Sequence, residues 1–225
     1  QLWRSILCPY ELAVKELTVK FKHMIEEYHE NDRYSPIEQV SGRVKSVSSI
    51  LEKMQRKHIP MERMEEELED IAGVRIICQF EEDIEAVASL IQKRSDMVIK
   101  SEKNYLKHVK QSGYRSLHLI VKTPIFLKEG KKMITVEVQL RTIAMDFWAS
   151  LEHKLRYKKS IPEDQSKYLA EEMMDCAQIS SALDERMQKV RDVIMQAEEK
   201  EEEKSSGVEP LMLRGLTERI RQKNL

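Results

Sequence analysis

The chain has 225 residues and a mass of 26.5 kDa, enough for one substantial α/β core and too little for two large ones. Its 38 Lys and Arg residues nearly cancel 39 Asp and Glu, which disfavours binding to a nucleic-acid backbone by bulk charge alone. Hydrophobic residues make up 41% of the chain and argue against disorder. Three widely separated cysteines predict a reducing compartment and no zinc module, and no apolar run reaches membrane-spanning length. We therefore expect a cytoplasmic protein.

The first part of the chain predicts a helix followed by a strand. Apolar residues recur at helical spacing over 10–30, with Glu and Lys between them, which predicts an N-terminal helix. Residues 40–45 then alternate between two kinds of side chain, as in a strand. Ser35 followed by Pro36 also fits a helix start, but Gly42 and the β-branched residues around it favour the strand.

A second helix is expected after Ser46, which fits an N-cap, because apolar residues follow at helical spacing. Another face of this helix carries Ser49, Lys53 and Arg56 at positions i, i+4 and i+7. By itself, such a face is equally a solvated charged surface or part of a site. A charged helix over 61–69 is predicted next.

The middle of the chain predicts two strands, a helix and a basic loop. The apolar run 74–80 is typical of a buried strand, but Arg75 interrupts it and needs a partner or a site to point into. A helix over 82–93 and a short strand near 97–99 follow. The segment 101–116 is predicted to be a mobile loop. An ordinary hairpin connection is the alternative, but length and one-signed charge favour a loop that faces anions.

Two further strands are expected in the second half. The first covers 117–123 and ends at Pro124, and a turn near 129–130 leads to the second, over 134–142. This second strand has the clearest period-2 alternation of the chain, with one apolar side. Its other side carries an acid, an amide and a guanidinium: Glu137, Gln139 and Arg141.

The chain closes with helical patterns. One helix is expected over 143–157, and a long one over 162–203 whose heptad-like apolar stripe is typical of a packing or assembly seam. We therefore expect one domain over 1–203. Its core covers 35–158 between the N-terminal and C-terminal helices. A tail over 204–225 forms at most a short helix.

The order α, β, α, β, α, β, β, β, α, α predicts an α/β or α+β domain with a mixed sheet flanked by helices. Neither GxxxxGK[ST] nor GxGxxG occurs, and GxSxG and HExxH are also absent. Polar residues instead gather at strand ends and on one sheet face. Asp70, before one strand, and Glu137, within another, are expected to converge as ligands of Mg²⁺ among basic residues that bind phosphate. The pattern alone predicts a phosphoryl-transfer site.

Four segments resemble, in order, the synthetase domain of the RelA/SpoT family: GRVKSVSSILEKMQRK, EDIAGVRIICQF, SGYRSLHLIV and VEVQLRTIAMDFWASLEHKLRYK. The resemblance runs from Ser35 to about Lys158 and is greatest to the single-domain small alarmone synthetases. RIIC and RTIAMDFWASLEHK resemble their RelP-type branch in particular. No His-Asp dipeptide occurs, so the hydrolase domain of the long family members is not expected.

The resemblance implies a nucleotidyltransferase-like fold and transfer of pyrophosphate from ATP to the 3'-hydroxyl of GDP or GTP, with release of AMP. Asp70 resembles the family's Mg²⁺ ligand. Glu137 matches the acid near the acceptor hydroxyl, as general base and second metal contact. Arg43 and Arg75 match the arginines that hold adenine, because a planar guanidinium stacks on a base. The remaining matches form the triphosphate grip: Lys45, Ser49, Lys53 and Arg56.

The resemblance also assigns an acceptor site. Tyr114 matches the aromatic residue that stacks on guanine. Asp146 stands where related enzymes can carry Asn, and a carboxylate there would accept hydrogen bonds from N1–H and the 2-amino group of guanine. Lys110 is the phosphate-binding lysine of the loop, although Val109 precedes it where the long enzymes often have Pro. Further acceptor-site candidates are His118, Gln139 and Glu152.

Two other functions stay open at this point. A different nucleotidyltransferase would transfer a nucleotide, but such enzymes usually have two acids close together on one strand, and VEVQ supplies only Glu137. A non-catalytic RNA-binding or regulatory module would have no need for both Asp70 and Glu137, and RNA binding is not indicated by the charge balance. By resemblance we expect a bacterial homotetramer without membrane association, with the choice among GDP, GTP and GMP open.

Overall fold

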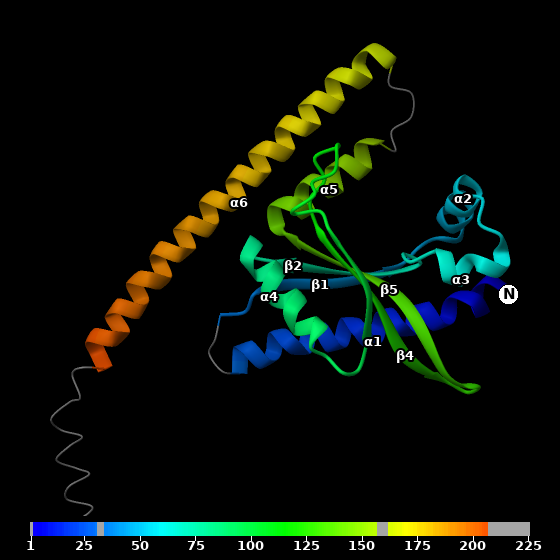
Figure 1. Cartoon of the computed structure of the whole chain (residues 1–225), viewed down its shortest axis with the longest axis horizontal. Helices are drawn as coiled ribbons and strands as arrows, with labels where there is room; N and C mark the ends of the chain where they lie inside the picture. Colours follow the sequence, from blue (N-terminus) through cyan, green and yellow to red (C-terminus); the bar gives the residue numbers. More distant parts are fainter. Residues whose placement is uncertain (1, 31–33, 157–161, 207–225) are drawn as a thin grey trace, which may run out of the picture. The chain divides into compact units, whose positions relative to one another are not determined.

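The computed structural model describes residues 2–30, 34–156 and 162–206 (Figure 1). Within these ranges the elements follow the predicted order, with a 3₁₀ turn and a one-turn helix inside the predicted charged helix. The elements are α1 (Leu2–Glu30), β1 (Ile37–Val44), α2 (Val47–Lys57), η1 (Met61–Arg63), α3 (Met64–Glu67), β2 (Ala72–Cys78), α4 (Glu81–Gln92), β3 (Val98–Asn104), β4 (Leu117–Leu127), β5 (Gly130–Thr142), α5 (Ile143–Arg156) and α6 (Glu163–Ser206).

Five strands form one mixed sheet in the order β1-β2-β5-β4-β3. β2 and β5 are parallel, and the other neighbouring pairs are antiparallel. The predicted fold class, a mixed sheet flanked by helices, is confirmed. Although α4, β3 and β4 separate β2 from β5 in the chain, the crossover makes them neighbours in the sheet. It is this pairing that places the polar residues of the second half beside those of the first.

One face of the sheet forms the hydrophobic core with α1 and α4. The apolar residues of β5 are buried, as the alternation over 134–142 predicted, and they belong to one cluster with side chains of both helices. Because side chains alternate along a strand, Glu137 and Gln139 point to the opposite face. Buried members of the cluster include Leu17 and Phe21 of α1, Ile84 and Ile91 of α4, and Ile134, Val136, Val138 and Leu140 of β5.

α1 packs closely on β1 at a glycine. A Cβ atom at Gly42 would lie 2.4 Å from Cγ1 of Val14 and 2.9 Å from Oγ1 of Thr18, so a larger residue would push helix and strand apart. The strand predicted at 40–45 is confirmed as Ile37–Val44, and the alternative of a helix that starts at Ser35 is wrong.

Several boundaries differ from the prediction, and three of them have a clear physical reason. The N-terminal helix already begins at Leu2, where Trp3 and its neighbours pack on the core. β3 extends over Val98–Asn104, because it pairs with β4 through the start of the predicted loop. β4 continues through Pro124, since β3 pairs with β4 only as far as Lys122 and a proline is tolerated along such an edge.

The chain divides into two compact units, residues 1–184 and 185–225. The first holds the sheet, the shorter helices and α6 as far as Asp184, and the second continues α6 to Ser206. The tail predicted over 204–225 lies outside the described residues, apart from 204–206, which belong to α6. No helix within the described ranges combines the length and the apolar character needed to span a membrane.

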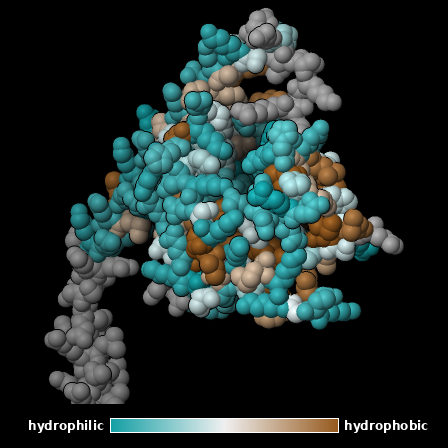
Figure 2. All heavy atoms as spheres, turned by 45° about the vertical axis from the view of Figure 1, so that its right-hand side comes forward, coloured by the Kyte–Doolittle hydropathy of each residue, from teal (hydrophilic) through white to brown (hydrophobic). Residues whose placement is uncertain are grey.

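Hydrophilic side chains cover most of the face shown in Figure 2, with smaller hydrophobic patches between them. Part of the apolar stripe predicted on the C-terminal helix is exposed. The exposed members of the stripe include Ile179, Leu183, Met187, Val190 and Ile194.

Candidate active site

The sheet register sets the predicted polar residues in rows across three strands. Arg43 of β1 pairs with Gly73 of β2, and Gly73 pairs with Glu137 of β5. Residues two apart on a strand share a face, so the next row lies on the same surface. That row consists of Ser41, Arg75 and Gln139.

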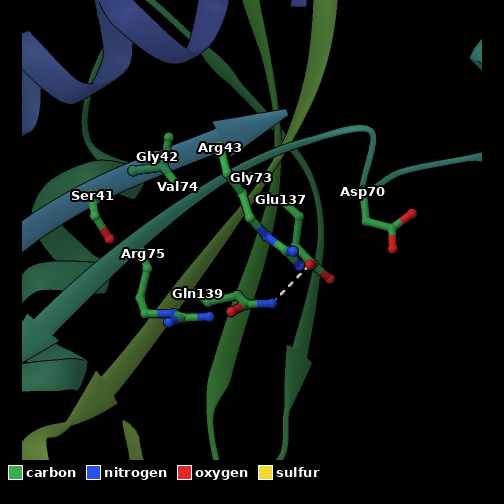
Figure 3. A pocket seen from close by; sticks show the side chains of 9 residues that line it. All are labelled: Ser41, Gly42, Arg43, Asp70, Gly73, Val74, Arg75, Glu137 and Gln139. Atoms are coloured by element: carbon green, nitrogen blue, oxygen red, sulfur yellow. Dashed lines mark hydrogen bonds between the residues drawn. The ribbon is translucent and has the colours of Figure 1, made fainter. Parts of the chain in front are cut away.

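A pocket opens over these two rows (Figure 3). Gly73 has no side chain, which leaves space between Arg43 and Glu137. In Figure 3 the side chain of Arg43 reaches toward Glu137, and Asp70 stands on the turn before β2. The pocket therefore brings together five of the predicted site residues. Its lining consists of Ser41, Gly42, Arg43, Asp70, Gly73, Val74, Arg75, Glu137 and Gln139.

Asp70 gathers two of the predicted phosphate-binding lysines. Lys45 follows β1, and its backbone N–H donates to the carbonyl of Ile71, which brings the end of β1 beside the turn before β2. The ammonium groups of Lys45 and Lys53 lie 2.5 and 2.7 Å from Oδ2 of Asp70. Burial raises the pKa of Asp70, but the hydrogen bonds and charges of the two lysines outweigh it, so this pKa is lowered overall.

The two other predicted phosphate ligands lie on the same helix as Lys53. α2 begins after Ser46, whose side chain accepts a hydrogen bond from the backbone N–H of Ser49, so the predicted N-cap is confirmed. The hydroxyl of Ser46 also donates to Oγ of Ser49 at 2.9 Å. Arg56 is in the last turn of α2 and is exposed. α2 thus carries all three residues, with Lys53 turned to Asp70.

Glu137 is held by hydrogen-bond donors from two strands. Nδ1 of His118 lies 3.1 Å from Oε1 of Glu137, and Nε2 of Gln139 donates to Oε2 at 3.0 Å. Burial raises the pKa of Glu137, but the interactions with His118 and Gln139 outweigh it and lower this pKa overall. The acid is therefore a carboxylate near neutral pH, available as a proton acceptor or metal ligand.

A chain of hydrogen bonds links Glu137 to the predicted guanine-stacking residue. Nε2 of His118 lies 2.8 Å from the hydroxyl of Tyr114, and Nη2 of Arg141 donates to the same hydroxyl at 2.7 Å. One assignment of protons satisfies every contact: Arg141 donates to Tyr114, Tyr114 donates to Nε2 of His118, and Nδ1–H donates to Glu137. His118 is thus part of the site, buried between its two partners.

Lys110 lies beside two aromatic rings and within electrostatic range of Glu152. The ammonium of Lys110 lies 4.4 Å from the ring centre of Tyr105 and 4.9 Å from that of Tyr114. Burial lowers the pKa of Lys110, whereas the charges of Glu137 and Glu152 oppose the shift. Lys110, in the loop before β4, therefore lies within electrostatic range of Glu137 on β5 and Glu152 on α5.

Asp146, the predicted guanine reader, binds two arginines. Its Oδ1 lies 3.2 Å from Nη1 of Arg75 and 3.2 Å from Nη1 of Arg141. Arg75 was expected from the sequence to need a partner, and this carboxylate, at the start of α5, supplies it. The interaction connects the predicted adenine-binding arginine to the acceptor side of the pocket.

The residues present fit a magnesium ion. Oδ1 of Asp70 is buried and has no hydrogen-bond partner, whereas Oδ2 receives both lysines. An unpartnered, ionised carboxylate oxygen in a pocket is a ready ligand for a hard cation. The described part of the chain holds no group of three or more His, Cys, Asp and Glu suited to a metal. Mg²⁺ usually takes one or two carboxylates together with substrate phosphates and water.

One residue of the site was missed from the sequence. Arg141 was noted only as part of the alternation, yet that alternation with Glu137 and Gln139 was sufficient to place it on the same face. Two basic residues of the segment predicted to face anions have acid partners within the chain: Lys103 lies 2.7 Å from Glu69, and Arg115 lies 2.8 Å from Glu81. The sequence carries no local signal for either pair.

Comparisons with known proteins agree with this geometry. The chain matches the family model "Region found in RelA / SpoT proteins" over residues 42–162. It is 43% identical to the GTP pyrophosphokinase YjbM of Bacillus subtilis (strain 168) over 209 residues, which is 92% of this chain and 97% of that protein. It is also 43% identical to the GTP pyrophosphokinase YwaC of the same strain, over 82% of this chain and 88% of that protein.

Solved structures give the same result. The small alarmone synthetase 1 from Bacillus subtilis bound to its product pppGpp has a TM-score of 0.81 and 43% sequence identity, and the match covers 86% of this chain and 98% of that one. A GTP pyrophosphokinase family protein from Streptococcus pneumoniae also has a TM-score of 0.81, with 41% identity over 87% of this chain and 95% of that one.

The chain therefore belongs to the RelA/SpoT family. The match to nearly the full length of these relatives makes it a small alarmone synthetase, an enzyme of the pyrophosphokinase class, as the four sequence motifs predicted.

Proposed function

We propose that this enzyme transfers the pyrophosphate group of ATP to the 3'-hydroxyl of GDP or GTP, which gives ppGpp or pppGpp and AMP. The observation that carries the proposal is the pair of acids in one pocket: Asp70, held ionised by two lysines, and Glu137, held ionised by His118 and Gln139. The relatives named GTP pyrophosphokinase support the same reaction, and so does the small alarmone synthetase 1 from Bacillus subtilis bound to its product pppGpp.

On the donor side, the two lysines that bind Asp70 in this structure bind the triphosphate when ATP is present. Lys45 and Lys53 each lie close enough to Asp70 to exchange a carboxylate oxygen for a phosphate oxygen. Ser49 and Arg56 extend the same phosphate grip along α2. Mg²⁺ bound to Asp70 and Glu137 would supply neutralisation of phosphate charge. Arg43 and Arg75 hold the adenine with their guanidinium planes.

On the acceptor side, the oxygen of the 3'-hydroxyl of GDP or GTP bonds to the β-phosphorus of ATP. At the same time, Glu137 accepts the proton of this hydroxyl. The bond from the β-phosphorus to the α–β bridging oxygen breaks, and this oxygen leaves with AMP. His118 and Gln139 hold the carboxylate in place through its two oxygens. Most of the rate then comes from positioning and charge neutralisation.

Four residues bind the acceptor nucleotide in this proposal. Tyr114 stacks on guanine, and Lys110 meets the acceptor phosphates with Glu152 beside it. Asp146 accepts hydrogen bonds from guanine, which adenine does not offer at the same positions. If Asp146→Ala left the preference for GDP over ADP unchanged, the guanine-reading role would be wrong and Asp146 would serve only to hold its two arginines.

Product analysis tests the reaction. Incubation with ATP, GDP and Mg²⁺ is expected to give AMP and a guanosine tetraphosphate in equal amounts. Release of inorganic pyrophosphate instead would indicate nucleotide transfer and overturn the proposal. The same assay with GDP, GTP and GMP in turn would rank the acceptors, and incubation of the product with the enzyme alone would show whether any hydrolysis occurs. We propose none.

We also propose that the enzyme acts as a homotetramer in the bacterial cytoplasm. The exposed apolar side chains on α6 support an assembly, because such a row is unfavourable in water unless another surface covers it. Light scattering on the purified chain would give the number of subunits, and a monomer at micromolar concentration would contradict this part.

A further inference from the structure

The loop that carries Tyr114 rests on the first half of α6. Gly113 has a φ of +89°, and a Cβ atom on it would lie only 2.6 Å from the Cβ of Ala177. Tyr114 packs with Trp148 and Ala177 in a small hydrophobic cluster that is separate from the main core. Close contact with α6 therefore occurs at the residue directly before the predicted guanine-stacking tyrosine.

A second contact ties α6 to the helix that follows β5. The indole N–H of Trp148 donates to the main-chain oxygen of Met173 at 2.9 Å. Met173 and Ala177 lie one helical turn apart, so the same face of α6 meets both α5 and the loop. This face is distinct from the exposed apolar stripe, of which Ile179 is 69% exposed.

A third contact comes from a buried carboxylate. Asp184 is 7% exposed, and its Oδ2 accepts a hydrogen bond from the hydroxyl of Thr142, the last residue of β5, at 2.7 Å. The same oxygen lies 3.8 Å from Nη1 of Arg115, whose Nη2 donates to Glu81 at 2.8 Å. Arg115 directly follows Tyr114, so the loop is held from α6 on both sides of the tyrosine.

We infer that the first half of α6 is a positioning element of the acceptor site, in which Ala177 and Asp184 fix the loop around Tyr114 through Gly113 and Arg115. Neither residue lines the pocket. Ala177 and Asp184 act through the loop and not by contact with the nucleotide, so both are positioning residues. The inference rests on the proposed function, since it assigns to Tyr114 the binding of the acceptor nucleotide.

Enlarging the contact at Ala177 tests the inference without touching the pocket. Ala177→Leu would force Gly113 and α6 apart, and we expect the KM for GDP to rise about tenfold while the KM for ATP stays unchanged. The control is Gln178→Leu, which adds the same side chain at the neighbouring, exposed position. Hydrogen exchange of a peptide that spans residues 105–116 should be faster in Ala177→Leu than in the control.

Asp184→Asn is a second variant, for the case that Ala177→Leu does not fold. It keeps the shape of the side chain and removes only its charge. Asn still accepts from Thr142 but loses the attraction to Arg115, and we expect the KM for GDP to rise about threefold, with faster exchange over 105–116. Asp175→Asn, an exposed position on the same helix, is the control and should match the wild type.

Two results would overturn the inference. The first is that, in both Ala177→Leu and Asp184→Asn, hydrogen exchange over residues 105–116 and the KM for GDP are the same as in the controls. The other is an equal loss of ATP and GDP binding with a lowered melting temperature, which indicates a general loss of structure. The exchange measurement needs no turnover. A wild-type enzyme without pyrophosphate transfer would thus refute the proposed function, whereas the exchange rates alone would still decide whether α6 fixes the loop.

Discussion

The donor and acceptor halves of the pocket are built in different ways. The donor half comes from one stretch of chain, from β1 through α2 to the start of β2, and a single acid, Asp70, gathers its lysines. The acceptor half joins Tyr114 to residues of β4, β5, α5 and α6 that are far apart in the sequence. The donor half is therefore mainly a local structure held by charge, whereas the acceptor half depends on tertiary packing.

This difference predicts how each half fails. Removal of a charge in the donor half leaves the backbone in place and changes the field that the phosphates meet. Displacement of one element in the acceptor half moves Tyr114, the partner of His118, and so disturbs the residue that holds Glu137. Glu137 belongs to both halves, because it lines the pocket together with Arg43, Asp70 and Arg75 and ends the hydrogen-bond chain from Arg141 through Tyr114 and His118.

The largest effect is expected at this shared residue. Glu137→Gln keeps the size of the side chain and removes the proton acceptor, so synthesis should fall by about 10²- to 10⁴-fold while much of the nucleotide binding remains. Initial rates and calorimetric binding of each nucleotide measure the two outcomes. Glu129→Gln, in the exposed turn before β5, is the control. Synthesis at the wild-type rate would refute the role of Glu137 in the reaction.

Asp70→Asn should give the next largest effect, confined to the donor half. The rate with Mg²⁺ is expected to fall about 100-fold, because the ionised metal ligand is lost. In EDTA, by contrast, the variant should bind ATP at least as tightly as the wild type, since Lys45 and Lys53 no longer share a carboxylate. Weaker binding in EDTA would contradict the view that Asp70 competes with phosphate for these lysines.

Glu69→Gln offers a matched control for Asp70, because Glu69 is the adjacent acid and also holds two lysines. Its partners are Lys100 and Lys103, at 3.1 and 2.7 Å. Glu69 does not line the pocket, so Glu69→Gln is expected to leave the Mg²⁺ dependence of the rate unchanged. A loss as large as that in Asp70→Asn would mean that the acids act by their summed charge.

In the acceptor half, two substitutions of Tyr114 distinguish the contribution of stacking from that of hydrogen bonding. Tyr114→Ala removes the ring and should raise the KM for GDP about tenfold or more, because stacking of a base is worth about 1–3 kcal/mol. Tyr114→Phe keeps the ring but breaks the chain from Arg141 to His118, so we expect a nearly normal KM and a modest fall in kcat. An effect of Tyr114→Ala confined to the KM for ATP would contradict the stacking role.

The same contrast explains what the sequence could predict. The residues of the donor half fall at short spacings on elements with clear periods, as in the case of Lys45 and Lys53 around α2, so a motif locates them. Glu137 and Gln139 were placed on one face by strict alternation. The contacts of Asp184 with Thr142 and Arg115 join segments with no shared period, and only the packing of α6 on the loop creates them.

Acidification should change the stability contributions of Asp70 and Asp184 in opposite directions. This effect is expected to be smaller than the effects on activity above. Lys45 and Lys53 outweigh burial and lower the pKa of Asp70 below its usual value of 3.8, whereas burial outweighs Thr142 and Arg115 and raises the pKa of Asp184. A lowered acid pKa contributes stability that is present above the unfolded pKa and is lost as the pH falls through the folded pKa. A raised acid pKa has the opposite sign, so its contribution grows as the pH falls.

Melting temperatures of the wild type, Asp70→Asn and Asp184→Asn, measured without divalent cations from about pH 7 to about pH 3, test these signs. The advantage of the wild type over Asp70→Asn, about 1 kcal/mol at neutral pH, should begin to decrease only when the pH falls below 3.8, the usual pKa of an aspartate. Its advantage over Asp184→Asn should instead increase on acidification. Parallel curves for the two variants would mean that charge and packing do not divide between the donor and acceptor halves as their contacts indicate.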